Sequence, residues 1–271
     1  MQKSARKFRK LGNAIVGLAD TTFGTAVDTT LFLLFACLAT STVKTTYDSF
    51  RVVEEVDALR NRFNYASIKR AIYGLTHQKL ISRSPSRSSL DIAITDLGKK
   101  RLASIIPTYQ TKRPWDGFVY LISYDIPTKL NHARDLLREH IKTTGGVKLQ
   151  ESLWINPYNP SLLLEEFANL HNIPGTILVS KLGHDGAIGE EELTDVIVRV
   201  YELNKLTERY NEFIATYKDT PKVKSTALLY DYLTVLKDDP QLPFALLPKN
   251  FPADTAYRLA KPFLDKLNFT R

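Results

Sequence analysis

Apolar residues in the first part of the chain recur at helical spacing. From Tyr65 to Lys79 the pattern places Ile68, Ile72 and Leu75 on one face, which predicts a helix. A second apolar stripe from Phe50 to Leu59 predicts another helix just before it, and a short polar turn separates the two. Two helices joined by such a turn are typical of a helix-turn-helix.

The spacing of apolar residues changes after this helix. A short strand is predicted from Leu80, and the alternation of Leu90, Ile92 and Ile94 predicts a second strand. The segment between the strands is rich in proline, serine and arginine, as expected for the tip of a wing. Thr95 fits as the N-cap of a further helix. The first part is therefore predicted to be a winged helix-turn-helix.

The middle of the chain shows a different order of elements. The run FVYLISYDI predicts a buried strand that ends near Asp125, and an amphipathic helix follows it. The run VKLQESLWINP predicts one long or bulged strand, or two strands that meet at Glu151. A helix at Ser161–Leu170 and the strand GTILVSK complete the order β-α-β(β)-α-β, which is that of a ferredoxin-like domain.

The last part of the chain is predicted to be helical. Apolar residues keep a spacing of three or four from Glu191 to about Lys218, which predicts a long helical stretch. We therefore expect an α+β fold with three parts. These are a winged-helix DNA-binding domain with a basic N-terminal arm at 1–110, a ferredoxin-like domain at 111–185, and a helical dimerisation and effector region at 186–271.

Charge is distributed unevenly along the sequence. The chain has a net charge of +8, but residues 1–114 carry +11 and residues 115–271 carry −3. The stretch from Ala58 to Leu90 contains seven Lys or Arg residues and no Asp or Glu. A basic field on a helix-turn-helix favours binding to a polyanion such as double-stranded DNA.

The motif and the charge together predict ten DNA-contacting side chains. On the second helix these are Ser67, Lys69, Arg70, Tyr73 and His77. The predicted phosphate contacts are Arg60, Arg62 and Lys79, and the predicted wing contacts are Arg83 and Arg87. The alternative is a solvated basic face on a winged helix that binds protein.

Asp125 is the only candidate for catalysis. A carboxylate at the end of a strand could meet the same residue of a second copy and hold Mg²⁺ between them. In the alternative, Asp125 only ends the strand and accepts hydrogen bonds from the backbone. The sequence has no HExxH, CxxC, Walker lysine or GxSxG motif, so neither an enzyme nor a resident cofactor is the leading prediction.

The sequence does not predict a membrane segment. The apolar run Leu31–Ala39 is nine residues long, whereas a helix that spans a bilayer needs about 20. Cys37, in this run, is the only cysteine of the chain, which rules out a disulfide within the chain. We therefore expect a cytoplasmic protein in a reducing compartment.

Several sequence landmarks in fixed order resemble one family. They are the winged helix, WDGFVYLISYDIP, SLWINP, YNEFI, and the tail YDYLTVLKDDPQLPFALLP followed by FP. Over nearly its whole length the chain resembles the PaaX family of bacterial transcriptional repressors. Its middle is also similar to the small ferredoxin-like nuclease of CRISPR adaptation, whose first strand ends in a Tyr-Asp pair like Tyr124-Asp125.

The resemblance implies a homodimeric repressor on a palindromic operator. In the family the ligand that releases the repressor is typically an acyl-CoA such as phenylacetyl-CoA. No ligand-binding motif matches residue by residue, so no effector-binding residue is assigned. The alternative function is a Mg²⁺-dependent nuclease, or a nucleic-acid-binding protein related to CRISPR adaptation, that uses Asp125.

Overall fold

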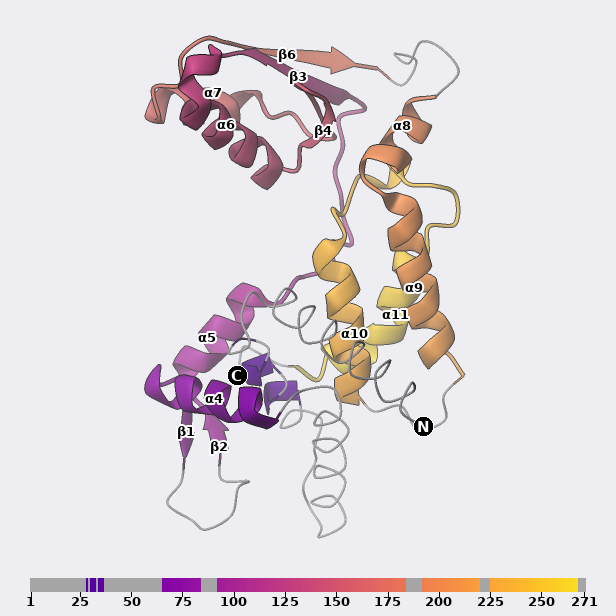
Figure 1. The fold of residues 1–271 in the computed structure, drawn as a ribbon. Helices are drawn as coiled ribbons and strands as arrows, with labels where there is room; N and C mark the ends of the chain where they lie inside the picture. The colour runs from indigo at the N-terminus through magenta and orange to yellow at the C-terminus, as the bar shows by residue number, and fades with distance from the viewer. Residues whose placement is uncertain are drawn as a thin grey trace, which may run out of the picture. The chain divides into compact units, whose positions relative to one another are not determined.

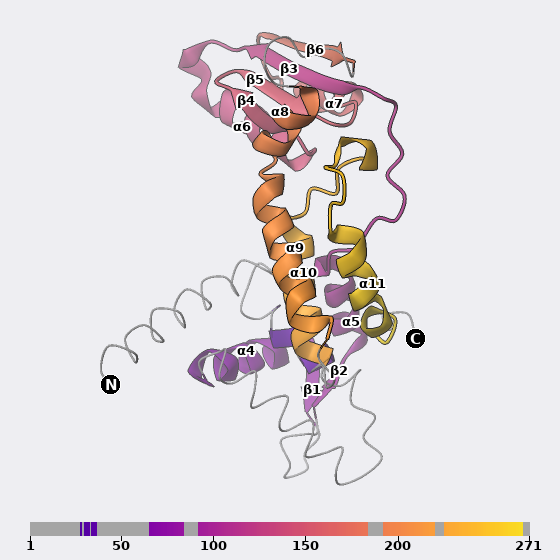
Figure 2. The same ribbon diagram turned by 90° about the vertical axis from the view of Figure 1, so that its right-hand side faces the viewer.

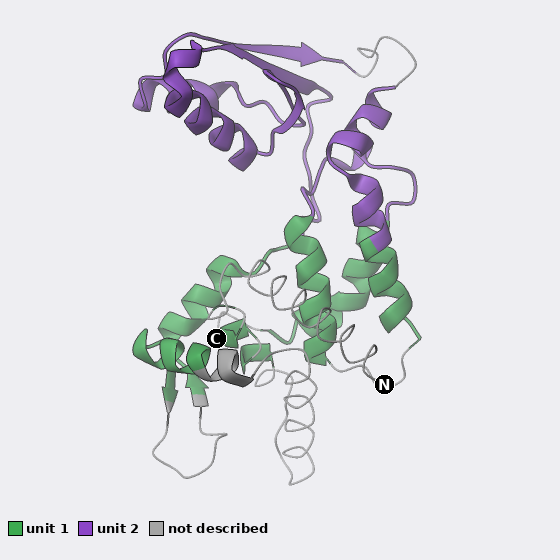
Figure 3. Cartoon of the chain, viewed as in Figure 1, with its two compact units in different colours: residues 1–108, 209–238, 252–271 green, residues 109–208, 239–251 purple. Residues whose placement is uncertain are grey.

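The chain forms two compact units that alternate along the sequence (Figure 3). The computed structural model describes residues 28, 30–32, 34–36, 65–83, 92–183, 192–219 and 225–267. The first unit combines residues 1–108, 209–238 and 252–271, and the second combines 109–208 and 239–251. Helices together with two antiparallel sheets confirm the predicted α+β class.

The first unit contains a helix, a strand pair and a second helix in consecutive order (Figure 1). These are α4 (Tyr65–His77), β1 (Ile81–Arg83), β2 (Ile92–Ile94) and α5 (Asp96–Ile105). The strands pair antiparallel with Ile81 opposite Ile94. These elements confirm the predicted helix, strand pair and following helix. The predicted helix at Phe50–Leu59 lies outside the described residues, so the helix-turn-helix stays a prediction.

Helices from the far end of the sequence complete the first unit. They are α10 (Ser225–Asp238), α11 (Ala253–Leu264) and the part of α9 (Leu203–Tyr217) from Arg209 onward. The Arg209 guanidinium bonds the Asp238 carboxylate at 2.8 Å, and the Phe213 and Tyr232 rings lie 5.6 Å apart. Helices α9 and α10 therefore pack through both a polar and an aromatic contact.

An ion pair between a buried aspartate and an exposed arginine fixes part of the apolar run near the start of the chain. Residues 30–32 and 34–36 are helical, and Leu31, Phe32 and Ala36 are fully buried. The buried carboxylate of Asp28 accepts two hydrogen bonds from the Arg101 guanidinium, at 2.6 and 2.8 Å. A bidentate contact of this kind constrains the start of this helix against α5.

The second unit is built on a four-stranded antiparallel sheet in the order β4-β5-β3-β6 (Figure 2). Its elements are β3 (Val119–Asp125), η1 (Thr128–Leu130), α6 (Asn131–Thr143), β4 (Val147–Gln150), β5 (Leu153–Asn156), α7 (Ser161–Leu170), β6 (Thr176–Leu182) and α8 (Leu193–Val200). A short 3₁₀ segment, η2 (Phe244–Leu246), belongs to the same unit.

Helices α6 and α7 cover one face of this sheet (Figure 1). The core between them contains Ile122 and Tyr124 of β3, Trp154 of β5, Leu137 of α6 and Leu164 of α7. This β-α-β-β-α-β order with an antiparallel sheet is the predicted ferredoxin-like arrangement. Of the two alternatives for VKLQESLWINP, the structure has two strands, which meet at a turn at Glu151 and Ser152.

The long helical stretch predicted from Glu191 to about Lys218 consists of two helices. Helix α8 ends at Val200 and α9 begins at Leu203, and between them Glu202 has a left-handed backbone with φ of 51°. The Tyr201 hydroxyl lies 2.9 Å from the Gly145 carbonyl oxygen and 3.3 Å from that of Ile155. These contacts with the sheet region hold Tyr201 at the break, and burial raises the pKa of its hydroxyl.

No helix among the described residues is both long enough and apolar enough to span a membrane.

Candidate nucleic-acid interface

Helix α4 has one buried side and one exposed side. Ala71 and Leu75 are buried, whereas Arg70, Tyr73 and His77 are exposed. Tyr73 is 75% exposed, which is unusual for a large aromatic residue. The helix contains no acidic residue, so α4 itself contributes a cation, a phenol and an imidazole to this side and no carboxylate.

Lys79, two residues after the end of α4, has a left-handed backbone conformation. Lys79 has φ of 58°, its N–H donates to the Thr76 carbonyl at 3.1 Å, and the Leu80 N–H donates to the Leu75 carbonyl at 2.9 Å. This pair of hydrogen bonds is a Schellman motif, in which the left-handed position usually carries glycine. The motif turns the chain directly into β1 and leaves the Lys79 side chain exposed at the junction.

Thr95 connects the end of α4 to the start of α5. Its hydroxyl oxygen accepts a hydrogen bond from the Gly98 N–H at 3.1 Å, which confirms the predicted N-cap. The same hydroxyl lies 2.7 Å from the Lys79 carbonyl oxygen and 3.1 Å from that of Leu80. One side chain therefore satisfies backbone groups of both helical ends.

The structure describes some of the predicted contact residues in full, some only by their backbone, and others not at all. Arg70, Tyr73, His77 and Lys79 are exposed on α4 or at its end. For Ser67 and Lys69 in α4 and Arg83 in β1, the structure describes the backbone but not the side chain. Three further predicted residues lie outside the described part of the chain: Arg60, Arg62 and Arg87. The structure brings the first four together, and DNA contact by any of the ten stays a prediction.

Asp125 lies at the end of β3, opposite Thr176 of β6, and it is exposed. Its carboxylate has no hydrogen bond or ion pair with the described residues, in contrast to the predicted alternative of bonding to the backbone. Its carbonyl oxygen lies 2.1 Å from where a Cβ on Gly175 would be, so only glycine fits beside it. Within the described ranges, no three His, Cys, Asp or Glu residues cluster as metal ligands would.

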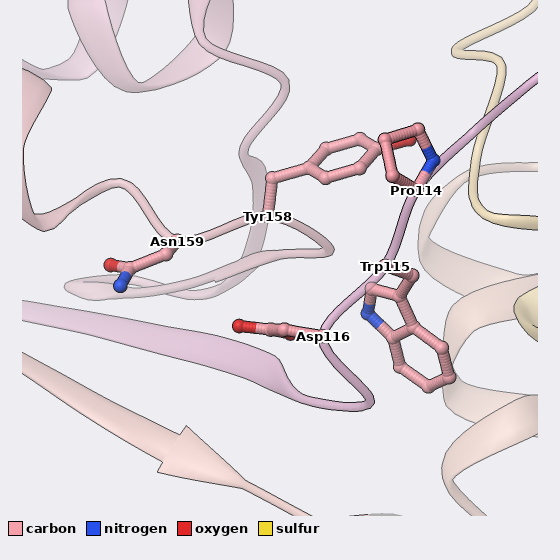
Figure 4. Close-up of a pocket in the computed structure, with 5 residues that line it drawn as sticks. All are labelled: Pro114, Trp115, Asp116, Tyr158 and Asn159. Atoms are coloured by element: carbon pink, nitrogen blue, oxygen red, sulfur yellow. The ribbon is translucent and has the colours of Figure 1, made fainter.

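The sequence did not single out Asp116 and Asn159, although both line a cavity in the second unit (Figure 4). Asp116 follows Trp115 in the landmark WDGFVYLISYDIP. That aromatic-acid pair, just before a buried strand, is the sequence signal that could have drawn attention to the cavity.

Comparison with known families finds a match to part of the second unit. A family model described as the PaaX protein central Cas2-like domain matches residues 112–194. The chain carries a PaaX central domain. This match covers β3 to the start of α8 and confirms the resemblance to the PaaX family that the sequence landmarks indicated. The PaaX family consists of transcriptional regulators.

Among solved structures, the chain is similar to the uncharacterized protein Rv0674 from Mycobacterium tuberculosis. The two share 14% sequence identity with a TM-score of 0.49, over 86% of this chain and 92% of the other. No curated protein matches the sequence.

Proposed function

We propose that the chain is a transcriptional repressor that binds double-stranded DNA in a sequence-specific way, with α4 as its recognition helix. The exposed side of α4 carries the proposal, because Arg70, Tyr73 and His77 project from a helix that contains no acidic residue. A helix of this kind fits the major groove, where arginine can bond guanine and neighbouring polar groups can bond phosphates.

The surrounding sequence supports the same proposal. Residues 58–90 carry seven bases and no acid, so the field around α4 attracts phosphates. The antiparallel pair β1 and β2 follows α4 directly, as a wing follows a recognition helix. Arg87 falls in the segment that connects these strands, and Lys79 lies where α4 meets β1. These two residues are proposed to contact the DNA backbone.

Two further features of the proposal come from the PaaX family. The chain would act as a homodimer on a palindromic operator, with half-sites about one helical turn apart or a multiple of that distance. An acyl-CoA-like effector would release it from the DNA. Sedimentation of the protein with and without operator DNA tests the dimer, and a thermal-shift screen of CoA esters tests the effector.

Selection of bound sequences from random DNA, followed by fluorescence anisotropy, tests the main proposal. A single palindromic sequence should emerge, and affinity for it should fall steeply as salt rises, because bound cations are released from the DNA. Arg70→Ala should weaken binding to the selected sequence by roughly 10-fold or more, the usual effect of losing one arginine contact to a base.

Lys249→Ala is the matched control, since it removes an exposed cation from the second unit. Its affinity for DNA should equal that of the wild type. Enrichment of no sequence, or equal losses for Arg70→Ala and Lys249→Ala, would contradict the assignment of α4 as the recognition helix.

The second candidate function is a Mg²⁺-dependent nuclease. The match to a Cas2-like domain and the exposed Asp125 at the end of β3 favour it. One carboxylate per chain is a sparse site for Mg²⁺, which prefers several oxygen ligands, so a second copy would have to supply another carboxylate. Cleavage of labelled DNA or RNA with Mg²⁺ that Asp125→Asn abolishes would support this function, and intact nucleic acid would exclude it under those conditions.

A further inference from the structure

A cavity of about 400 Å³ lies in the second unit (Figure 4). It is lined by Pro114, Trp115, Asp116, Tyr158 and Asn159. Its volume falls within the range of small-molecule sites, roughly 300–1,000 Å³. The cavity is open to solvent, and all its lining residues except Trp115 are exposed. Two aromatic rings and a proline form its apolar part, and one carboxylate and one amide supply the polar groups, a combination found in small-molecule sites.

The two aromatic rings of the cavity are held in place. The Trp115 indole N–H donates to the Phe118 carbonyl at 2.7 Å, and the Tyr158 hydroxyl lies 3.4 Å from the Gln241 carbonyl oxygen. Ring orientations that are fixed before binding lower the entropic cost of packing a ligand against them. The walls are thus suited to a planar ring system.

The charged group that lines the cavity is Asp116. Its carboxylate accepts hydrogen bonds from the Tyr120 hydroxyl and, at 3.0 Å, from the Phe118 N–H. These bonds hold the pKa of Asp116 below its ordinary value, so the group is ionised at neutral pH. A carboxylate can accept about four hydrogen bonds, which leaves room for a ligand donor and disfavours a ligand that is itself a carboxylate.

Two nearby cations do not line the cavity. The Arg113 guanidinium is buried between the Tyr109 and Phe244 rings, 5.1 and 4.6 Å from their centroids. The Lys181 ammonium lies 5.0 Å from the centroid of the Phe118 ring. The groups that a ligand meets first are therefore the aromatic rings, the carboxylate and the amide.

The Asn159 side chain has a defined orientation. Its Oδ1 accepts a hydrogen bond from the Ser161 N–H at 3.0 Å, at the start of α7. The amide NH₂ group of Asn159 is thereby left as a donor. Figure 4 shows the Asp116 carboxylate and the Asn159 side chain on the same side of the cavity, with the Trp115 ring on the other. The lining thus supplies one hydrogen-bond acceptor, the Asp116 carboxylate, and one donor, the Asn159 amide.

We propose that this cavity binds a flat nitrogen heterocycle that carries an amino group, of the aminopurine kind. The ring packs against Trp115 and Tyr158. Its amino group donates to the Asp116 carboxylate, and a ring nitrogen accepts from the Asn159 amide. This site is separate from the proposed DNA interface, and it stands or fails independently of DNA binding.

Adenosine and inosine are suitable probes, because they match in size and differ mainly in an amino group against a carbonyl oxygen. Binding to the full-length protein is measured by calorimetry and by the fluorescence of Trp115. Adenosine should bind at least about 10-fold more tightly than inosine. In the same orientation the inosine carbonyl oxygen faces the Asp116 carboxylate and the inosine N1–H faces the Asn159 amide donor, so neither hydrogen bond forms. Benzoate, a flat carboxylate, should bind more weakly than adenosine.

Two variants test the two polar contacts one at a time. Asp116→Asn should weaken adenosine binding about 10-fold and narrow the preference over inosine, because the negative charge is lost. Asn159→Asp keeps the acceptor for the Ser161 N–H but removes the donor, so it should also weaken adenosine binding. Glu151→Gln, a carboxylate change at the exposed turn between β4 and β5, is the control and should leave binding unchanged.

Circular dichroism checks that each variant is folded, and if Asp116→Asn is not, Asn159→Asp decides the question. Equal binding of adenosine and inosine would overturn the proposal. So would tighter binding of benzoate, no adenosine binding at millimolar concentration, or adenosine binding that both variants leave unchanged.

Discussion

At the scale of single residues, Lys79 has the most unusual backbone of the candidate interface. A left-handed conformation costs an L-residue about 1–2 kcal/mol, and glycine avoids that cost. Lys79 adopts it where α4 meets β1, with its side chain exposed. A lysine at this position therefore lowers the stability of the fold and places a positive charge at the junction of the two elements.

Lys79→Gly should raise the free energy of unfolding by about 0.5–1 kcal/mol. Relief of the left-handed strain stabilises the folded state, and this gain exceeds the loss from the greater freedom of glycine in the unfolded chain. The same change should weaken DNA binding and reduce the slope of log affinity against log salt by about 1, the effect of one lost phosphate contact. Urea denaturation and anisotropy titrations at several salt concentrations measure the two effects.

Lys79→Ala is the matched control, since it removes the charge but keeps the strain. It should weaken DNA binding as much as Lys79→Gly without the gain in stability. If the glycine variant is no more stable than the alanine variant, the strain attributed to Lys79 is absent.

Two aspartates near the ends of β3 show what the sequence could indicate at this scale. Asp125 stands at the end of an apolar run, a pattern visible in the sequence alone. The importance of Asp116 depends on the Tyr120 hydroxyl and on Asn159, which is 43 residues further along the chain and reaches the cavity only after folding. Local pattern could identify the first aspartate but not the second.

At the scale of elements, the contact between α5 and the end of α4 is unusually close. A Cβ on Gly98 would lie 2.2 Å from the Leu80 carbonyl oxygen and 2.8 Å from a methyl carbon of Ile94. The absence of a side chain at Gly98 thus lets α5 approach both Leu80 and β2. This approach also allows Thr95 to bond the backbone of both helical ends.

Gly98→Ala should lower the free energy of unfolding by about 1–3 kcal/mol, because the backbone must shift to relieve the clash. This loss should exceed the roughly 1 kcal/mol that alanine normally gains over glycine within a helix. The midpoint of urea denaturation measures it. Lys100→Ala, at an exposed position of the same helix, should change stability little, and a Gly98→Ala protein as stable as that control would contradict the close packing.

The elements were predictable to the extent that local spacing defines them. The bounds of α4, the two short strands, the Thr95 cap and the ferredoxin-like order all follow from periodicity and turn residues. The break between α8 and α9 does not, because apolar spacing continues through it. It depends on contacts of Tyr201 with Gly145 and Ile155, which lie more than forty residues away in the sequence.

At the scale of the whole molecule, the compact units do not follow the order of the sequence. The first unit joins residues 1–108 with 209–238 and 252–271. Periodicity and charge along a chain predict contiguous parts, such as 1–110, 111–185 and 186–271, because they carry no information on which distant helices pack together. The buried residues of α10 and α11, including Leu228, Tyr232 and Ala256, show how much apolar surface these helices bury.

A fragment of residues 1–110 should therefore be less stable than the same residues in the full chain. Without α10 and α11 the apolar surface that they cover becomes exposed, which removes stabilisation in proportion to its area. Hydrogen exchange of the α4 and α5 amides should be faster in the fragment and should slow again when residues 209–271 are added as a separate chain. Equal protection in the fragment and the full chain would show that the added helices contribute nothing.

The same interleaving has a consequence for synthesis. A ribosome produces the chain from its N-terminus, and domains generally fold as they emerge. The residues around α4 are made early, but their unit is complete only after 252–271 appear. Strands β3 to β6 of the second unit emerge well before then and can form their sheet first, although residues 239–251 complete that unit. The unit that contains α4 would thus be completed last, so that a prematurely terminated chain lacks that unit in complete form.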